Sequence, residues 1–303
     1  MVSAVILAYN RVAEVEITLD KLKSYAASLP FAVEIIVVDN ESADNTTAMV
    51  QDKFPDVRIV TIQKNVGISG WNEGFKIAKY KYLLVLDDDS HIESGLQEAV
   101  AYLEQNDRVG ILALNITSGP YLTDTWIWQD GRPWQHEQDL PGFFGCGAII
   151  RKEVYEKVGG FAEWVYVYAH EWEYGIRCLN AGYAIKYFQK SSVIHRASKI
   201  NRTAKRARMF GTRNEMAIVY KYFDDKRWTY ILRMFVNNLK RMKNEGVLNG
   251  WYDVVGAVKF IGFRSTLAHT PVTKEVQQFF IENYKNTFPV FRILKKLKRK
   301  TGS

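Results

Sequence analysis

Short apolar runs alternate with amphipathic segments along the first third of the chain. The apolar runs predict four strands, at residues 2–8, 33–38, 57–63 and 83–86. Segments with helical periodicity follow the first three runs and end near residues 28, 53 and 79. This rhythm is typical of a parallel sheet that carries helices on both faces, so the sequence predicts an α/β fold.

Polar residues stand where these strands are expected to end. They are Tyr9-Asn10, Asp39, the loop 65–74 and the triplet Asp87-Asp88-Asp89. Because ligands of open α/β sheets bind at the carboxyl ends of the strands, we expect these residues to share one ligand site. Adjacent aspartates repel one another unless a cation lies among them, and their hard oxygen atoms suit Mg²⁺ or Mn²⁺. Each feature also has a local explanation: Asp39 or the triplet could cap the next helix, and the loop could simply lead into one.

Charge divides the chain into two unlike parts. Residues 196–303 hold 24 basic and 7 acidic residues, whereas residues 1–195 carry a net charge of −9. Apolar and basic residues recur at helical spacing over 226–243, 251–263 and 288–300. Basic amphipathic helices suit an anionic membrane surface, but such a region could also pack on the body or in a homodimer. We expect no nucleic-acid partner, which would require a groove with stacking aromatics.

The two cysteines, Cys146 and Cys178, are too few for a disulfide framework and lack the spacing of metal ligands. Thiols in a reducing cytosol are the simplest interpretation. Because no apolar run reaches about 18 residues, we expect no membrane-spanning helix. The aromatic stretch 119–147, with Trp126, Trp128, Trp134, Phe143 and Phe144, could bind sugars or pack in the core.

An ordered series of motifs spans roughly residues 3–220. It comprises Val5–Arg11, Val37–Asp44, the loop Asn65–Gly74, Asp87–Asp89, Gly145–Arg151, Val158–Phe161, His170–Arg177, Ala181–Tyr183 and Val193–His195. The series resembles the family 2 glycosyltransferases with the GT-A fold, and Arg213-Asn214 resembles their rhamnosyltransferase branch. This resemblance implies a Rossmann-like, mostly parallel sheet flanked by helices. The catalytic domain would span 1–205, with the nucleotide-sugar part at about 1–95 and the acceptor part at about 96–205, followed by a basic helical region over 206–303.

The resemblance also implies roles for individual residues. Mn²⁺ or Mg²⁺ would be held by Asp87, Asp89 and His195 and would neutralise the diphosphate of the donor. The nucleotide-diphospho-sugar would be bound by Ala8, Tyr9, Arg11, Asp39, Asn65, Gly67, Trp71, Asn72, Asp87 and Asp88.

Sugar transfer to a hydroxyl needs a general base. When the family's Glu-Asp-x-Asp segment is aligned on Arg177, Glu171 takes the place of the basic Asp. The sequence departs from the family there, since His170 replaces the first Glu and Glu171 is one methylene longer than Asp. His170 is therefore a second candidate, and the segment could also be a helix in which Glu173 pairs with Arg177.

The implied enzyme is an inverting glycosyltransferase of bacterial cell-surface polysaccharide synthesis. Its donor would be dTDP-rhamnose or a UDP-sugar, and its acceptor a lipid-linked glycan. It would be cytoplasmic and peripheral on the inner face of the cell membrane. Two other classes stay open, a non-catalytic protein that binds membranes or anionic polymers and a nucleotidyltransferase. The latter needs a glycine-rich phosphate loop, and the segment from Ala8 to Arg11 contains no glycine.

Overall fold

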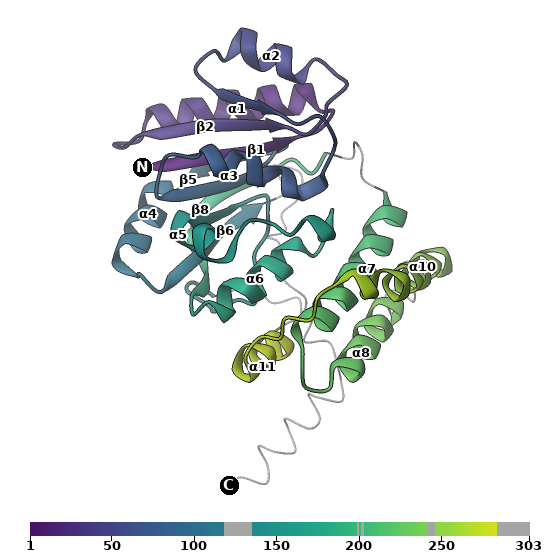
Figure 1. Ribbon diagram of the computed structural model, residues 1–303. Coiled ribbons are helices and arrows are strands. Elements are labelled where there is room, and N and C mark those ends of the chain that lie inside the picture. The colour runs from purple at the N-terminus through teal and green to yellow at the C-terminus, as the bar shows by residue number, and fades with distance from the viewer. Residues whose placement is uncertain (118–134, 199, 201–202, 241–245, 284–303) are drawn as a thin grey trace.

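The computed structural model describes residues 1–117, 135–198, 200, 203–240 and 246–283. Its centre is an eight-stranded sheet with the order β3-β2-β1-β4-β7-β6-β8-β5 (Figure 1). The strands are β1 (Val2–Ala8), β2 (Val33–Asp39), β3 (Arg58–Thr61), β4 (Tyr82–Asp87), β5 (Ser90–Ser94), β6 (Val109–Thr117), β7 (Ala148–Arg151) and β8 (Ala184–His195). Strands β1 to β4 pair in parallel, as does β6 with β8, whereas β7 and β5 are antiparallel to their neighbours. The expected mostly parallel α/β sheet is confirmed.

Helices cover both faces of this sheet because its strands are apolar on both sides. Along β4, Leu84 and Leu86 join one core cluster, and Leu83 and Val85 join the other. The first cluster is covered by α1 (Val12–Ala27), α2 (Thr46–Lys53) and α4 (Leu96–Gln105). The second is covered by α3 (Trp71–Ile77), α5 (Lys152–Val158) and α6 (His170–Asn180). Short 3₁₀ turns, η1 (Gly67–Gly70) and η2 (Glu163–Val165), precede α3 and α6.

The register of the strands brings the polar strand ends to one edge. Ala8 lies opposite Asp39, and Leu7 lies opposite Asp87. At the far side of the Asp87–Asp89 turn, Ser90 pairs with His195, the last residue of β8. Residues that are more than a hundred positions apart in the sequence therefore meet at this edge.

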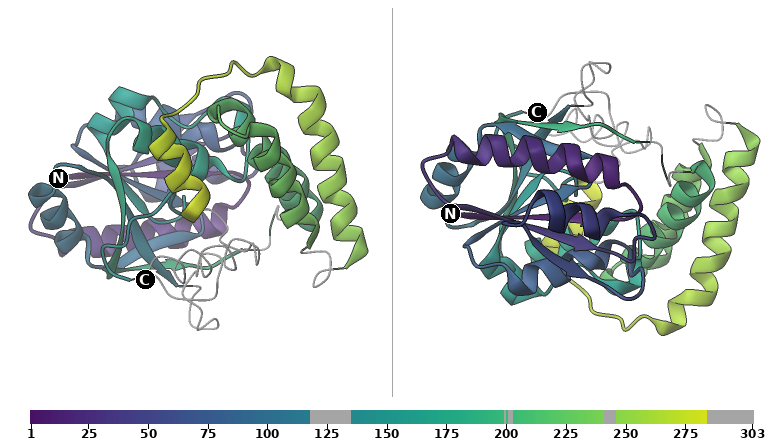
Figure 2. Two further views of the ribbon diagram at one scale, coloured as in Figure 1. Left: turned by 90° about the horizontal axis from the view of Figure 1, so that it is seen from below. Right: turned by 90° about the horizontal axis from the view of Figure 1, so that it is seen from above.

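The described residues after 203 are mostly helical, as the sequence predicted. It consists of α7 (Ala204–Tyr222), α8 (Arg227–Lys240), α10 (Val247–Phe263), the turn η3 (Arg264–Thr266) and α11 (Lys274–Asn283). A third apolar cluster joins these helices to Trp172 and Ile176 of α6. In both views of Figure 2, α10 forms the outer edge of the helical group, with α7 and α8 between it and the sheet. The basic segment 288–300 lies outside the described residues, and no helix among those described is long and apolar enough to cross a membrane.

Candidate active site

The aspartate triplet sits in a tight turn between β4 and β5. The backbone N–H of Asp87 donates to Oγ of Ser90 over 2.9 Å, and Ser90 already belongs to β5. The next helix, α4, begins only at Leu96 and has Gly95 as its N-cap. The alternative that the triplet merely caps a helix is therefore wrong. Its carboxylates instead lie at the edge of the sheet, beside Arg11 and His195.

Arg11 neutralises two of these carboxylates. Its Nη1 lies 2.8 Å from Oδ1 of Asp88 and 3.3 Å from Oδ2 of Asp89. Burial raises the pKa of Asp88 to about 7, against the opposing effect of the Arg11 charge. The backbone N–H of Tyr9 donates to the other oxygen of Asp88 over 3.3 Å. The residues after β1 thus position the Asp88 carboxyl rather than leaving it in solvent.

His195 lies beside Asp87 and Asp89 in a cluster that fits a divalent cation. Its Nε2 lies 3.1 Å from Oδ1 of Asp89 and 3.8 Å from Oδ2 of Asp87. Asp87 is the accessible member, with 29% of its side chain exposed. Ligand atoms of Asp87, His195 and Cys146 lie within 4.8 Å of one another. The carboxylates and the imidazole suit a divalent cation such as Mn²⁺, whereas a thiolate favours softer ions than Mg²⁺.

Cys146 is the residue in this cluster that sequence reasoning missed. Ligand spacing was sought along the chain, whereas these ligands come from β4, β8 and the segment before β7. The cysteines lack ligand spacing along the sequence, yet the fold brings Cys146 close to Asp87 and His195. The strand register explains the approach, because Val85 pairs with antiparallel Ala148 and two further steps bring Asp87 opposite Cys146.

Glu171 lies at the start of α6, with 16% of its side chain exposed. Burial raises its pKa to about 7, and the backbone N–H of Gly145 donates to it over 3.3 Å. Nδ1 of His170 lies 3.2 Å from the other carboxyl oxygen. Because burial lowers the pKa of His170 to about 4, the imidazole is neutral at pH 7 and does not form an ion pair with Glu171. A carboxyl poised near neutrality suits a general base.

Consecutive residues link the two halves of the site. Gly145 contacts the carboxyl of Glu171, and Cys146 belongs to the cluster with Asp87 and His195. A Cβ on Gly145 would come within 2.9 Å of the His170 ring, so only glycine fits there without displacement. The candidate base and the candidate metal ligands therefore belong to one active site.

The i,i+4 pair expected in α6 is present beside this base. Nη2 of Arg177 lies 2.7 Å from Glu173, which is buried and also accepts a hydrogen bond from the hydroxyl of Tyr222 in α7. The pair stabilises the helix that carries Glu171, so the structural interpretation of this segment and the catalytic one hold together.

The loop before α6 is held by Arg213 and Asn214 of α7. The amide nitrogen of the fully buried Asn214 lies 2.8–2.9 Å from the carbonyl oxygens of Val165, Val167 and Tyr168. Arg213 donates to the carbonyls of Trp164 and Val165. Three non-glycine residues of this loop, Tyr166, Tyr168 and Ala169, have positive φ angles of 60–64°. Such strained backbone persists only where its surroundings fix it, so these contacts define where α6 begins.

Among the residues expected to bind the nucleotide, Asp39 is 5% exposed and is engaged by its own loop. It accepts from the N–H of Ser42 over 2.9 Å and from the hydroxyl of Thr47. The carbonyl of the buried Ala8 accepts from Asn40, which ties the ends of β1 and β2 together. Asp39 thus lies at the expected edge. It does not cap α2, whose N-cap is Asn45, but holds the loop before that helix.

The expected donor loop forms a braced framework. The side-chain oxygen of Asn65 accepts from the N–H of Gly67, whose φ is +66°. Trp71 is 2% exposed and donates from its indole to the carbonyl of Leu86 over 3.2 Å, with its ring beside that of His170. Asn72 both donates to and accepts from the backbone of Phe161. The polar groups of Trp71 and Asn72 are therefore bound to the protein backbone, where they support the site.

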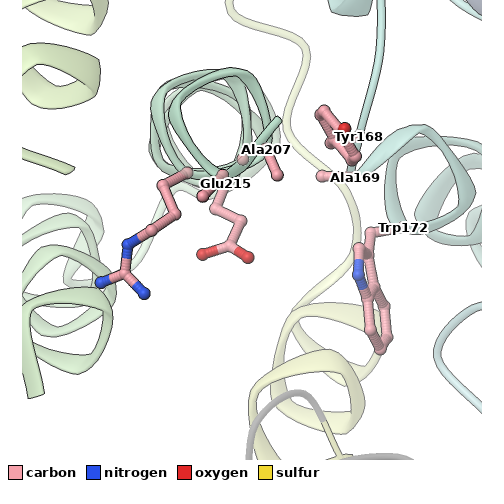
Figure 3. Close-up of a pocket in the computed structure, with 8 residues that line it drawn as sticks. Tyr168, Ala169, Trp172, Ala207 and Glu215 are labelled. Carbon is pink, nitrogen blue, oxygen red and sulfur yellow. The ribbon is translucent and has the colours of Figure 1, made fainter. Parts of the chain in front are cut away.

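A cavity of about 310 Å³ lies where α6 and its preceding loop meet α7 (Figure 3). It is lined by Tyr168, Ala169, Trp172, Ala204, Ala207, Arg208, Gly211 and Glu215. The carboxylate of Glu215 points into it, across from the indole of Trp172. Of the aromatic stretch 119–147, Phe143 is fully buried, and Trp126, Trp128 and Trp134 lie outside the described residues.

The α/β sheet, with carboxylates and a histidine at its carboxyl edge, is consistent with the GT-A fold of sugar-transferring enzymes. The model of glycosyl transferase family 2 matches residues 3–159, slightly more than half of the chain. The chain therefore belongs to glycosyl transferase family 2, which confirms the expected family and enzyme class.

A curated relative and several solved structures are similar to this chain. The poly-beta-1,6-N-acetyl-D-glucosamine synthase of Staphylococcus epidermidis is 34% identical over 95 residues, which are 30% of this chain and 22% of that protein. The chain thus spans about a fifth of that relative's length. TarS 1–349 of S. aureus has 16% identity and a TM-score of 0.51, over 80% of this chain and 72% of its own. The mannosyltransferase PcManGT of Pyrobaculum calidifontis has 16% identity and a TM-score of 0.56, over 98% and 84%. GalNAc-T7 has 13% identity and a TM-score of 0.63, over 95% and 58%. At these identities the structures share the fold.

Proposed function

We propose that this protein transfers a sugar from a nucleotide diphosphate to a hydroxyl of a lipid-linked or polysaccharide acceptor, with inversion at the anomeric carbon. The observation that carries the proposal is the carboxyl of Glu171, whose pKa burial raises to about 7. This carboxyl accepts a hydrogen bond from Gly145, and the next residue, Cys146, belongs to the cluster with Asp87 and His195. Such a carboxyl can accept the proton of the attacking hydroxyl near neutral pH.

Different residues of the site would perform different parts of the reaction. Glu171 orients the acceptor hydroxyl and takes its proton, while the loops after β1 and β2 hold the nucleotide. A divalent cation bound by Asp87, Asp89 and His195 would neutralise the charge that develops on the departing diphosphate. Attack from the side opposite the leaving group in one displacement inverts the anomeric configuration. The cavity beside Trp172 and Glu215 offers an aromatic ring and a carboxylate, which are common partners of sugar rings and hydroxyls.

For the donor we propose dTDP-rhamnose, in the synthesis of a bacterial cell-surface polysaccharide. Arg213-Asn214 supports this choice through its resemblance to the rhamnosyltransferase branch. A UDP-sugar is the second candidate, because TarS was solved with UDP-GlcNAc and GalNAc-T7 with UDP and Mn²⁺.

A thermal-shift panel of dTDP, UDP, GDP and CDP, each with and without Mn²⁺, tests the donor. A ligand that binds only the folded state raises the melting temperature, by RT ln(1 + [L]/Kd) in free energy. Stabilisation by dTDP that requires Mn²⁺, and that Asp87→Asn removes, is the expected result. A protein that no nucleotide stabilises under either condition would not have this function.

We further propose that the enzyme is cytoplasmic and binds the inner face of the cell membrane through α8 and α10. Exposed apolar side chains gather on these helices: Trp228, Leu232 and Val236 on α8, and Val247, Leu248, Trp251, Val258 and Ile261 on α10. We call this set the α8–α10 apolar surface. The three on α8 recur every fourth residue and so share one face. The guanidinium groups of Arg227 and Arg264 lie 5.8 Å and 5.5 Å from the ring of Trp228.

Apolar residues flanked by cations complement an anionic bilayer, and a lipid-linked acceptor would be presented there. Co-sedimentation with phosphatidylglycerol vesicles, compared with phosphatidylcholine vesicles, measures this contact. Leu248→Glu combined with Trp251→Glu should abolish sedimentation, whereas Ile17→Glu, on an exposed site of α1, should not. If the surface instead binds a second copy of the chain, light scattering gives a dimer that the double variant dissociates, and the membrane assignment fails.

A further inference from the structure

Cys146 lies in a short segment whose packing fixes its position. A Cβ on Gly145 would meet the ring of His170 at 2.9 Å, and one on Gly147 would meet Ile116 at 2.9 Å. Gly145 also donates from its backbone to Glu171. The segment is therefore held from both sides, and the side chain between the two glycines is 6% exposed.

The register of the sheet places this segment beside the end of β4. Antiparallel pairing of β4 with β7 ends at Val85 and Ala148, and its continuation places Cys146 opposite Asp87. The ligand atoms of Asp87, Cys146 and His195 lie within 4.8 Å of one another. Two ligands bound at about 2.0–2.3 Å to one ion are at most about 4.5 Å apart, so small side-chain shifts would suffice for all three to reach it.

We propose that Cys146 is a ligand of the divalent cation, through its sulfur atom and together with Asp87 and His195. Nothing in the family resemblance assigns a role to this cysteine. The inference rests on the metal site of the proposed function and is independent of which sugar is transferred. When the sulfur–metal bond forms, the thiol proton is released to solvent, so binding of the ion releases a proton.

A thiolate changes which ions the site prefers. Soft sulfur ligands favour Zn²⁺ and the later transition metals, whereas Mg²⁺ prefers oxygen ligands alone. The site should therefore bind Co²⁺, Zn²⁺ and Mn²⁺ more tightly than Mg²⁺. Replacing Cys146 by Ser should reduce this preference, because it exchanges the soft sulfur for a smaller, harder oxygen in the same position.

Titration with Co²⁺ of the whole, reduced protein tests the proposal without any sugar donor. Sulfur bound to Co²⁺ gives a charge-transfer absorption in the near ultraviolet that oxygen and nitrogen ligands do not give. Cys178 is the matched control, since it is the other cysteine of the chain and lies on the buried face of α6, in the core. Equilibrium dialysis measures the bound Co²⁺, and circular dichroism melts verify that each variant is folded.

The wild type and Cys178→Ala should show the absorption at one bound Co²⁺, and Cys146→Ser should bind Co²⁺ without it. An absorption that persists in Cys146→Ser, or a wild type that binds Co²⁺ without absorbing, overturns the proposal. A wild type that binds no Co²⁺ overturns both this proposal and the metal dependence. A protein that shows the absorption but transfers no sugar leaves Cys146 a ligand and refutes the proposed function alone.

Discussion

Replacing Glu171 by Gln should make the protein more stable while removing its activity. Burial raises the pKa of this carboxyl from 4.5 to about 7. The folded state thus resists ionisation, and stability falls as the pH rises from the unfolded pKa to the folded one. One pKa unit corresponds to about 1.36 kcal/mol, so the ionised carboxylate costs about 3 kcal/mol above pH 7. Glutamine is neutral at every pH and avoids this cost.

Urea unfolding of the wild type and Glu171→Gln at pH 8 and pH 5 measures the effect. The variant should gain about 3 kcal/mol at pH 8, and the gain should shrink to about 1 kcal/mol at pH 5, where the wild-type carboxyl stays protonated in the folded state. Glu173→Gln is the matched control on the same helix. It should lose about 3 kcal/mol, because Arg177 would be left without its buried partner. Equal stability of Glu171→Gln and the wild type at pH 8 would refute the reasoning.

Three further predictions concern the same region. Asn214→Ala leaves the carbonyls of Val167 and Tyr168 without their donor and frees the strained loop, so kcat should fall about 100-fold while nucleotide affinity is unchanged. The control Gln277→Ala, which removes a buried donor to the carbonyl of Asp225, should lower the melting temperature but not kcat. In a pH–rate profile, kcat/KM should rise with pH and level off above about 7, because Glu171 must be ionised to act as the base. Gly67→Ala would bring a Cβ to 2.0 Å from the carbonyl of Tyr166, so the free energy of unfolding in urea should fall by about 2 kcal/mol or more. The control Gly182→Ala has a positive φ but open space around it, and its free energy of unfolding should fall by only about 1 kcal/mol.

The sheet and its functional edge could be predicted from the sequence because they depend on local patterns. The run Leu83–Leu86 is apolar on both faces, so it had to be an inner strand, and the residues after β1, β2 and β4 had to share an edge. The pairing of Glu173 with Arg177 followed in the same way from helical spacing.

Contacts between distant segments could not be predicted in this way. Cys146 joins Asp87 only through the antiparallel insertion of β7, which no local pattern specifies. Asn214 resembles a branch motif, but its contacts with the loop before α6 depend on how α7 packs. Trp71 is of a residue type that often binds ligands, yet it is buried with its ring beside that of His170, and this follows from the tertiary structure.

Release of nucleotide from dTDP-rhamnose and from UDP-GlcNAc tests the central claim most directly. It is measured at pH 8 with Mn²⁺ and a lipid extract as acceptor, for the wild type and Glu171→Gln side by side. We expect one donor to be turned over by the wild type, and the variant to be about 10²- to 10⁴-fold slower with the same nucleotide affinity. Turnover by the variant at the wild-type rate, or no release from either donor by the wild type, would contradict the account.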